Sequence, residues 1–310
     1  MKYRFIIITA LLLMVGLTGV QGTRESSFSI IGYLPEYRVE TVSPEKLIPI
    51  TDLIYFGIKP PANGHLPVTP VKNSILRKLH EIKHITKCRL LICVGGWGRS
   101  TGFPTLAGNK DFRKQFISNI RDYCRTNGFD GIDYDWEHPK GVKEKSTYVE
   151  LLTETAKAFN KDGLIVTVAQ ANWQDLGKKV YKAIDRVHFM SYDHQFPQAT
   201  LGKSKADIKK LLGWGCPANK IALGLPFYGR NRNRDARTYA QLIGKRQKNN
   251  DDIIDGFAFN GRLTIKKKVQ FTQEQKLNGI MIWELGQDSQ GSNESLLNTI
   301  QLKILDKNDH

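Results

Sequence analysis

The chain has 310 residues, of which 40% are hydrophobic, and its 46 Lys and Arg against 30 Asp and Glu give a formal net charge of +16. This length and composition exclude a disordered or fibrous chain and suit one large domain. The positive charge favours anionic polymers, phospholipid head groups or nucleic acid as partners, although a soluble protein rich in lysine would show it as well.

The first 22 residues have the pattern of a secretory signal peptide. A basic start and an apolar run over residues 5–15 precede Val20 and Gly22, which are suitable for the –3 and –1 positions of a cleavage site. A membrane span needs about 20 apolar residues, so this run is short for one, and an uncleaved anchor is the alternative. We therefore expect a signal peptide at 1–22, a secreted or extracytoplasmic protein without a stable membrane span, and a folded domain at 27–310.

Short apolar runs then alternate with helical patterns along the whole domain. Strands are predicted at residues 28–34, 52–58, 89–96, 129–137, 164–171, 186–193, 220–228 and 279–285. Helices are predicted at residues 74–86, 111–125, 147–160, 204–213, 262–276 and 294–305. Eight such units most naturally close as a (β/α)8 TIM barrel, an α/β fold. A doubly wound open sheet is the alternative, but no GxGxxG turn follows the first strand.

Neither the cysteines nor the basic runs form a known binding motif. Cys88, Cys93, Cys124 and Cys216 have no metal-binding spacing and are few for a disulfide scaffold. Export would permit a disulfide bridge, but the sequence does not choose the pairing. The basic run at 266–268 lies in a predicted helix and is expected to be a solvated face. There is no zinc finger, RNA-binding motif or basic-region heptad, so we expect no nucleic-acid partner.

The segment FDGIDYDWEHP, at residues 129–139, places acids at alternate positions of a predicted strand. Since successive strand side chains point to opposite faces, Asp133, Asp135 and Glu137 share one face, and the apolar residues between them share the other. The acids would point into the barrel, with Glu137 nearest the C-terminal rim where such barrels place their chemistry. Crowding and burial raise at least one carboxyl pKa, as a general acid requires. A polar barrel plug or a metal site is the alternative, and the metal site lacks ligands because His138 is the only nearby His.

This acid segment is one of five distinctive strand ends. They are DGIDYDWE at 130–137, LICVGGWG, HFMSYD, LGLPFYGR and GIMIWELGQD. In this order they resemble the DxxDxDxE strand and the third, sixth, seventh and eighth strands of glycoside hydrolase family 18, the chitinase family. The resemblance implies a barrel that hydrolyses β-1,4 links between N-acetylglucosamine units with retention. The substrate's own acetamido group would assist through an oxazolinium intermediate, without cofactor or metal.

The resemblance also implies a role for each acid. Glu137 would protonate the leaving oxygen and later deprotonate water. Asp135 would orient the acetamido N–H and stabilise its developing charge. Asp133 would share the proton of Asp135, and Asp130 would help to shape the strand. Tyr192 would hydrogen-bond the acetamido carbonyl, unless it is an ordinary strand-end tyrosine.

Aromatic and polar residues at other strand ends would bind the sugar. Trp283 would lie beneath the reacting ring, Asp193 would approach it, and Trp97 and Trp173 would be platforms at the mouth, although barrel or loop packing would also place tryptophans there. Arg230 would reach a hydroxyl or remain a surface base. The remaining residues expected to contact substrate are Tyr33, Tyr228 and Met190, and those expected to support the site are Gly95, Gly96 and Cys93.

Two features depart from the family pattern. Cys93 stands where the SxGG serine is expected, and a thiol would hydrogen-bond the acid row more weakly. About 50 residues separate the seventh and eighth strands. This is too short for a large α+β insertion, so we expect one domain with an open cleft that suits short oligosaccharides or mid-chain cuts.

The resemblance leaves several functions to be separated. The favoured one is a chitinase acting as a monomer on chitin or another N-acetylglucosamine-containing glycan. An endo-β-N-acetylglucosaminidase or a peptidoglycan hydrolase is the alternative. A non-catalytic chitin-binding lectin is less favoured, because the chain retains the acid Glu137. The sequence does not decide endo or exo action or the exact glycan.

Overall fold

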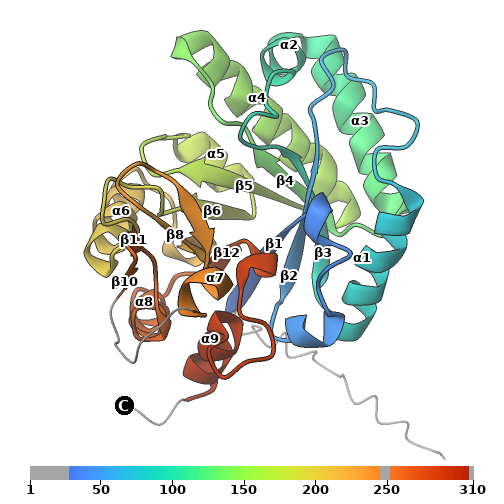
Figure 1. Cartoon of the computed structure of the whole chain (residues 1–310). Helices are drawn as coiled ribbons and strands as arrows, with labels where there is room; N and C mark the ends of the chain where they lie inside the picture. The colour runs from blue at the N-terminus through green and yellow to red at the C-terminus, as the bar shows by residue number, and fades with distance from the viewer. Residues whose placement is uncertain (1–27, 245–251, 307–310) are drawn as a thin grey trace, which may run out of the picture.

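The computed structural model describes residues 28–244 and 252–306, and its centre is a closed barrel of parallel strands in the order β1-β12-β7-β6-β5-β4-β3-β2 (Figure 1). The barrel strands are β1 (Ser29–Pro35), β2 (Asp52–Ile58), β3 (Arg89–Gly95), β4 (Gly131–Asp135), β5 (Ile165–Ala171), β6 (Arg186–Met190), β7 (Ile221–Pro226) and β12 (Gly279–Trp283). The predicted (β/α)8 fold is therefore confirmed. The predicted signal peptide, residues 1–22, lies outside the described residues.

Helices surround the barrel on its outer side (Figure 1). They are α1 (Asn73–Thr86), α2 (Phe103–Gly108), α3 (Lys110–Thr126), α4 (Gly141–Phe159), α5 (Lys178–Ala183), α6 (Leu201–Gly213), α7 (Tyr239–Ile243), α8 (Arg262–Glu274) and α9 (Leu296–Leu305). Two 3-10 turns, at Glu36–Arg38 and Pro44–Leu47, follow β1 before the chain enters β2. No helix within residues 28–244 and 252–306 is long and apolar enough to cross a membrane.

The two faces of each barrel strand pack into different surroundings. On the outer face of β4 and just beyond its end, Tyr134 and Trp136 are buried with Phe103 and Tyr148 of the surrounding helices, and the Phe103 and Trp136 rings stack with centroids 5.0 Å apart. The inner face forms a smaller apolar cluster that includes Tyr33 and is interrupted by buried polar groups. Alternation along the strand therefore separates a dry shell from a polar barrel interior.

A small antiparallel sheet lies between β7 and β12 in the chain. Its strands are β8 (Tyr228–Arg230), β9 (Ala236–Thr238), β10 (Ile253–Ile254) and β11 (Phe257–Ala258), in the order β10-β11-β8-β9. The strand predicted at 220–228 is therefore wrong at its end, because β7 stops at Pro226 and Tyr228 belongs to this second sheet. In its described part, this segment holds no large α+β domain, as predicted.

All four cysteines are buried and none forms a disulfide with another. Cys88, Cys124 and Cys216 are each packed in the apolar shell, and burial raises the pKa of each thiol above its usual value. Cys93 lies on the inner face of β3. The described fold is thus held by apolar packing and hydrogen bonds without a covalent cross-link.

Candidate active site

The acid row, which consists of Asp133, Asp135 and Glu137, begins in β4 and continues past the end of that strand. The predicted strand at 129–137 is longer than the observed one, because the last pairing of β4 is Gly95 with Asp135. Beyond this pair, β3 and β4 both continue into loops at the barrel rim, so Glu137 lies two residues past the end of β4. The strand predicted at 186–193 is too long for the same reason, since β6 ends at Met190.

Asp133 is fully buried in the barrel and surrounded by hydrogen-bonding groups. The Tyr33 hydroxyl donates to its Oδ2 atom at 2.6 Å, and the Thr167 hydroxyl donates to its Oδ1 atom at 2.6 Å. Nδ1 of His188 lies 3.1 Å from the same Oδ1 atom. The parallel register aligns Cys93 with Asp133, and burial together with the charge of Asp133 raises the pKa of the thiol well above its usual value. Cys93 therefore stands beside the acid row as a neutral thiol.

Asp135 lies above Asp133 on the same face and is only 3% exposed. Its Oδ1 atom has no hydrogen-bond partner among the described residues. Burial raises its pKa well above the usual range, and the charges of Glu137 and Asp133 raise it further. Because the carboxyl has little to stabilise a negative charge, the neutral form is favoured at this position.

Glu137 stands at the rim, and burial raises its pKa to about 7 against an opposing hydrogen bond from the Trp97 backbone. The charge of Asp193 across the cleft raises this pKa as well. The backbone N–H of Glu137 donates to Ser100 Oγ at 3.1 Å, which holds the loop, and His138 Nε2 lies 3.5 Å from its Oε2 atom. This carboxyl can therefore exist as an acid and as a base near neutral pH.

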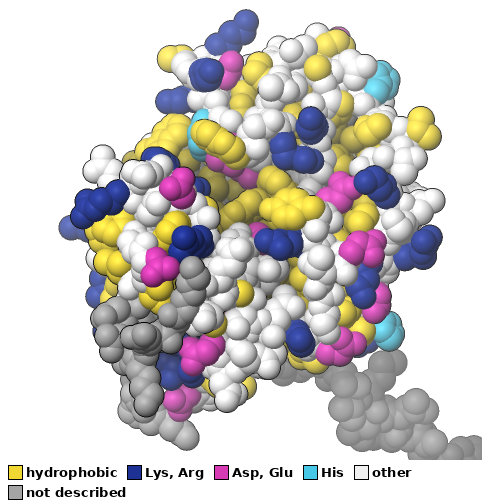
Figure 2. Space-filling view, viewed as in Figure 1, with side chains coloured by type: hydrophobic (Ala, Val, Ile, Leu, Met, Phe, Trp, Pro, Cys, Tyr) yellow, Lys and Arg dark blue, Asp and Glu magenta, His cyan; other side chains and the backbone are white. Residues whose placement is uncertain are grey.

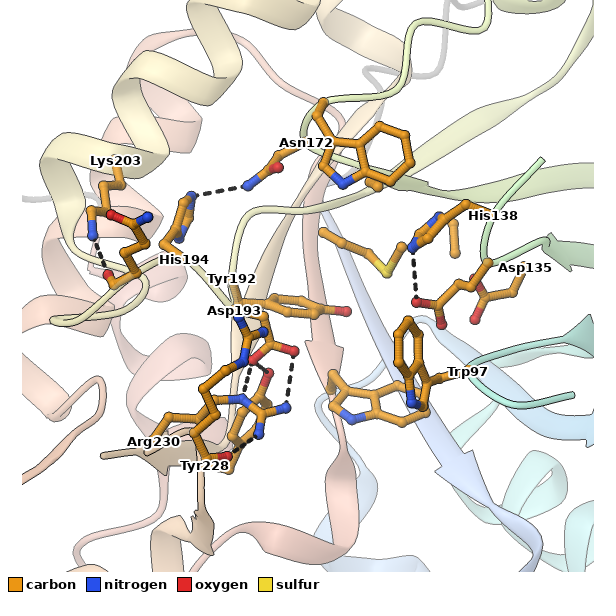
Figure 3. A pocket seen from close by; sticks show the side chains of 18 of the residues that line it. Trp97, Asp135, His138, Asn172, Tyr192, Asp193, His194, Lys203, Tyr228 and Arg230 are labelled. Atoms are coloured by element: carbon orange, nitrogen blue, oxygen red, sulfur yellow. Dashed lines mark hydrogen bonds and ion pairs between the residues drawn. The ribbon is translucent and has the colours of Figure 1, made fainter. Parts of the chain in front are cut away.

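The opposite wall of the cleft is built around Asp193. Tyr228 donates its hydroxyl hydrogen to Asp193 Oδ1 at 2.7 Å, and Arg230 donates from Nη2 to Oδ2 at 3.1 Å and from Nε to Oδ1. Figure 3 shows Tyr192 between this wall and the wall that carries Asp135. The two sides of the cleft therefore come from the ends of different strands, and Arg230 is ion-paired with Asp193.

A cleft of about 970 Å³ joins the two walls. Glu137, Asp135 and Tyr192 line it, and so does every residue predicted to contact substrate: Trp283, Asp193, Trp97, Tyr33, Trp173, Tyr228, Arg230 and Met190. The Trp97 and Trp173 side chains are 77% and 56% exposed. Figure 2 shows hydrophobic and acidic side chains in the hollow of this face, with Lys and Arg around it. An apolar cleft with a few converging polar groups is typical of a small-molecule or sugar site.

The supporting residues lie outside this cleft. Asp130 precedes β4, and its Oδ2 accepts hydrogen bonds from Lys83 Nζ at 2.6 Å and from the Leu90 backbone at 2.7 Å. Gly95 and Gly96 both have φ of +105°, in the region that favours glycine. The structure thus gives Asp130 a bracing contact at the far end of the barrel and gives the glycines a backbone role at the rim.

Several side chains that line the cleft were not predicted from the sequence. These are His138, Ala169, Ala171, Asn172, His194, Gln195, Lys203 and Arg234. His194 Nε2 lies 2.9 Å from Asp207 Oδ2 and 3.1 Å from Asn172 Nδ2. Both histidines come shortly after an active-site strand, and this position was the available signal. Within residues 28–244 and 252–306, no group of three His, Cys, Asp or Glu side chains converges as metal ligands.

Acids at the carboxyl end of a barrel strand beside an aromatic-lined cleft are typical of barrel enzymes that cleave glycosidic bonds. The sequence model of glycosyl hydrolases family 18 matches residues 29–288, and the chain belongs to this family. Chitinase 1 of Aphanocladium album is 25% identical over 68% of this chain and 64% of its own length. Chitotriosidase-1 of Mus musculus is 27% identical over 66% of this chain and 54% of its own length. The chain thus spans less than two thirds of either relative.

Solved structures of similar shape cover more of the chain. A chitinase of this family from the chitin utilization locus of Flavobacterium johnsoniae matches with a TM-score of 0.80 and 25% identity, covering 90% of this chain and 94% of its own. A chitinase from Bacteroides thetaiotaomicron matches with a TM-score of 0.78 and 22% identity, covering 91% and 98%. The second likeness shows the fold alone.

Proposed function

We propose that the chain hydrolyses β-1,4 links between N-acetylglucosamine units, in chitin or chitooligosaccharides, with retention of configuration. The observation that carries this proposal is Glu137, whose pKa of about 7 suits an acid–base catalyst and which stands at the rim of an aromatic-lined cleft. Family membership and the chitinases among its relatives support the same substrate class.

In the proposed reaction, Glu137 gives its proton to the glycosidic oxygen that leaves. At the same time, the acetamido oxygen of the N-acetylglucosamine unit that is being cleaved attacks the anomeric carbon of that unit. The C–O bond to the leaving sugar breaks, and the electron pair leaves with that oxygen. A cyclic oxazolinium ion forms, and a carboxyl oxygen of Asp135 accepts a hydrogen bond from its N–H. Water then attacks the anomeric carbon and gives its proton back to Glu137. Since the first step needs protonated Glu137, activity should fall as the pH rises through about 7.

The remaining cleft residues would hold the sugar in this geometry. Tyr192 and Trp283 line the same cleft as the acids. In the proposed complex, Tyr192 hydrogen-bonds the acetamido carbonyl and Trp283 stacks against the sugar ring. Tyr33 and Phe56 support the Trp283 ring with centroids 5.6 Å and 4.9 Å away. Such fixed supports restrict the substrate to a reactive orientation, which lowers the barrier.

Replacement of the acid tests the proposal directly. Glu137→Gln should keep oligosaccharide binding and lower turnover at least ~100-fold, because the amide retains the shape of the side chain and lacks the transferable proton. Initial rates on chitooligosaccharides and a binding titration of the same protein measure the two effects. Turnover that survives the change would remove Glu137 from this role.

A product profile separates the chitinase from the related hydrolases. The protein should release short products from chitooligosaccharides, and proton NMR of fresh product should show the β anomer first. Mass spectra of digests of chitooligosaccharides, N-glycans and peptidoglycan would be compared. Release from N-glycans or peptidoglycan without release from chitooligosaccharides would favour the alternative functions, and an α product would exclude the acetamido mechanism.

We also propose that the protein is exported, because residues 1–22 have the pattern of a signal peptide. Cleavage after Gly22 would leave the folded domain intact, since β1 begins at Ser29. The N-terminal sequence of protein recovered outside the cytoplasm measures the cut. Recovery of the full-length chain only inside the cytoplasm would contradict export.

A further inference from the structure

A chain of hydrogen bonds lies below the acid row and leads from Arg186 through His188 to Asp133. His188 is completely buried, and its Nε2 atom is 3.1 Å from the Nε atom of Arg186. A guanidinium group can only donate, so Nε2 must accept and carries no hydrogen. The ring is therefore neutral with its hydrogen on Nδ1, and burial lowers the pKa of His188 in agreement.

The hydrogen on Nδ1 is donated to the hydroxyl oxygen of Tyr33, which in turn donates to Asp133. Nδ1 of His188 lies 2.9 Å from the Tyr33 hydroxyl oxygen and 3.1 Å from Asp133 Oδ1. The Tyr33 hydroxyl gives its own hydrogen to Asp133 Oδ2, and Thr167 gives one to Oδ1. The Nδ1 hydrogen thus strengthens the Tyr33 hydroxyl as a donor, and the hydroxyl hydrogens of Tyr33 and Thr167 are both directed at Asp133. This arrangement stabilises a carboxylate at that position.

Arg186 is itself fixed at the lower end of the barrel. Its Nη2 atom lies 2.9 Å from Asp52 Oδ1, and both side chains are buried. Although burial opposes it, the charges of Arg186 and Arg89 lower the pKa of Asp52 to about 2. The ion pair therefore persists over the working pH range and holds the donor to His188 in place.

The charged and titratable groups around His188 come from four strands. They are Tyr33 on β1, Asp52 on β2, Asp133 on β4 and Arg186 on β6 itself. The carboxyl groups in this set are Asp52 and Asp133, and Arg186 is ion-paired with Asp52. Above them, Cys93 on β3 and Asp135 on β4 complete the row.

We propose that His188, held by Arg186, is a positioning residue that keeps Asp133 ionised and so leaves the proton of the acid pair on Asp135. The proposal rests on the proposed hydrolysis and adds the location of its second proton. Glu137 has one negatively charged neighbour fewer when Asp135 below it is neutral than when Asp135 is ionised. Without the His188 hydrogen, the proton can move to Asp133, and charged Asp135 would then make Glu137 hold its proton more tightly.

Two substitutions at this position separate the donor from the ring. His188→Asn places an amide N–H near the position of Nδ1, and His188→Leu removes the donor at similar volume. The apparent pKa of the high-pH limb of the kcat/KM profile is measured on a chitooligosaccharide. It should increase by roughly half a pH unit or more in the Leu variant and stay within about 0.2 units of the wild type in the Asn variant. Turnover of the Leu variant should drop at least ~10-fold, with partial recovery in the Asn variant.

Thermal unfolding of both variants separates a folding effect from the proton effect. An equal shift of the limb in both variants, or an unchanged limb in the Leu variant, would overturn the proposal. A wild-type protein that cleaves no N-acetylglucosamine polymer would instead refute the proposed function. In that case the carboxyl 13C chemical shifts of Asp133 and Asp135 still show which carboxyl carries the proton. Ionised Asp133 with protonated Asp135 at neutral pH would support the inference, and the reverse would contradict it.

Discussion

Glu137 shows how one residue gains reactivity at the expense of stability. Its side chain is 16% exposed, and the burial that raises its pKa to about 7 also disfavours its ionised form in the folded protein. In the unfolded chain the same carboxyl would ionise near its usual value of 4.5. The folded state therefore binds this proton more tightly than the unfolded state does between these two pH values.

The sign of this difference predicts a pH-dependent stabilisation by Glu137→Gln. As the pH rises from 4.5 to about 7, the wild-type protein loses free energy of unfolding because the unfolded chain releases this proton first. The Glu137→Gln variant has no proton to release here and does not lose it. The variant should gain about 1 to 3 kcal/mol in free energy of unfolding relative to the wild type between pH 4 and pH 8. Urea denaturation of both proteins at the two pH values measures it. An identical difference between the proteins at pH 4 and pH 8 would contradict the assigned burial effect.

At the scale of one element, the end of β3 fixes where the acids lie. A Cβ atom on Gly95 would come within 2.2 Å of the Asp135 carbonyl oxygen, which belongs to the neighbouring strand. One on Gly96 would come within 2.2 Å of the Phe56 ring. The backbone of β3 thus approaches β4 directly beneath Asp135, and only glycine permits both this approach and the positive φ.

Gly95→Ala should therefore cost both stability and activity. The obstructing atom is backbone and cannot rotate away, so we expect a loss of at least ~3 kcal/mol in the free energy of unfolding. Gly98 is a matched control, because its φ is +70° but a Cβ atom there would meet nothing within 4 Å. Gly98→Ala should cost only about 1 to 2 kcal/mol. Urea denaturation compares them, and equal losses would show that the contact with β4 is unimportant.

Strand periodicity was enough to predict the barrel and the inward face of β4. It did not predict strand ends, because a ladder stops where its partner turns away, as at Gly95, and this depends on residues distant in sequence. The run at 266–268 was expected to be solvated, and this is wrong for Lys268. That side chain is buried on the inner face of α8 and donates to Asn260 Oδ1 at 2.8 Å, and burial lowers its pKa to about 7.

The same limit applies to the candidate site. Residues at strand ends could be assigned from motifs, and these residues do line one cleft. His188 could not, because its importance depends on a network that joins β1, β4, β5 and β6 across the barrel interior. A sequence pattern within one strand contains no information on which neighbours meet at its inner face. Such contacts follow only from closure of the sheet.

For the whole molecule, the cleft is assembled from many parts of the chain. Its lining extends from Tyr33 in β1 to Trp283 at the end of β12, and Tyr228 and Arg230 come from the small sheet. The small sheet is tied to the barrel rim through Asp193. Since the described segment between β7 and β12 adds no large domain, the exposed side chains of Trp97 and Trp173 border an open cleft.

This open cleft predicts cuts within a polymer chain. A soluble chitin derivative should lose viscosity early, while few reducing ends have formed, because the substrate can enter the cleft along its length. Viscosity and reducing ends are measured on one digest, with Glu137→Gln as the inactive control. Trp97→Ala and Trp173→Ala should raise KM several-fold with a smaller change in kcat, since exposed platforms bind ground and transition states alike. Reducing ends that accumulate as a single short product, with viscosity unchanged, would show instead that the protein acts from chain ends.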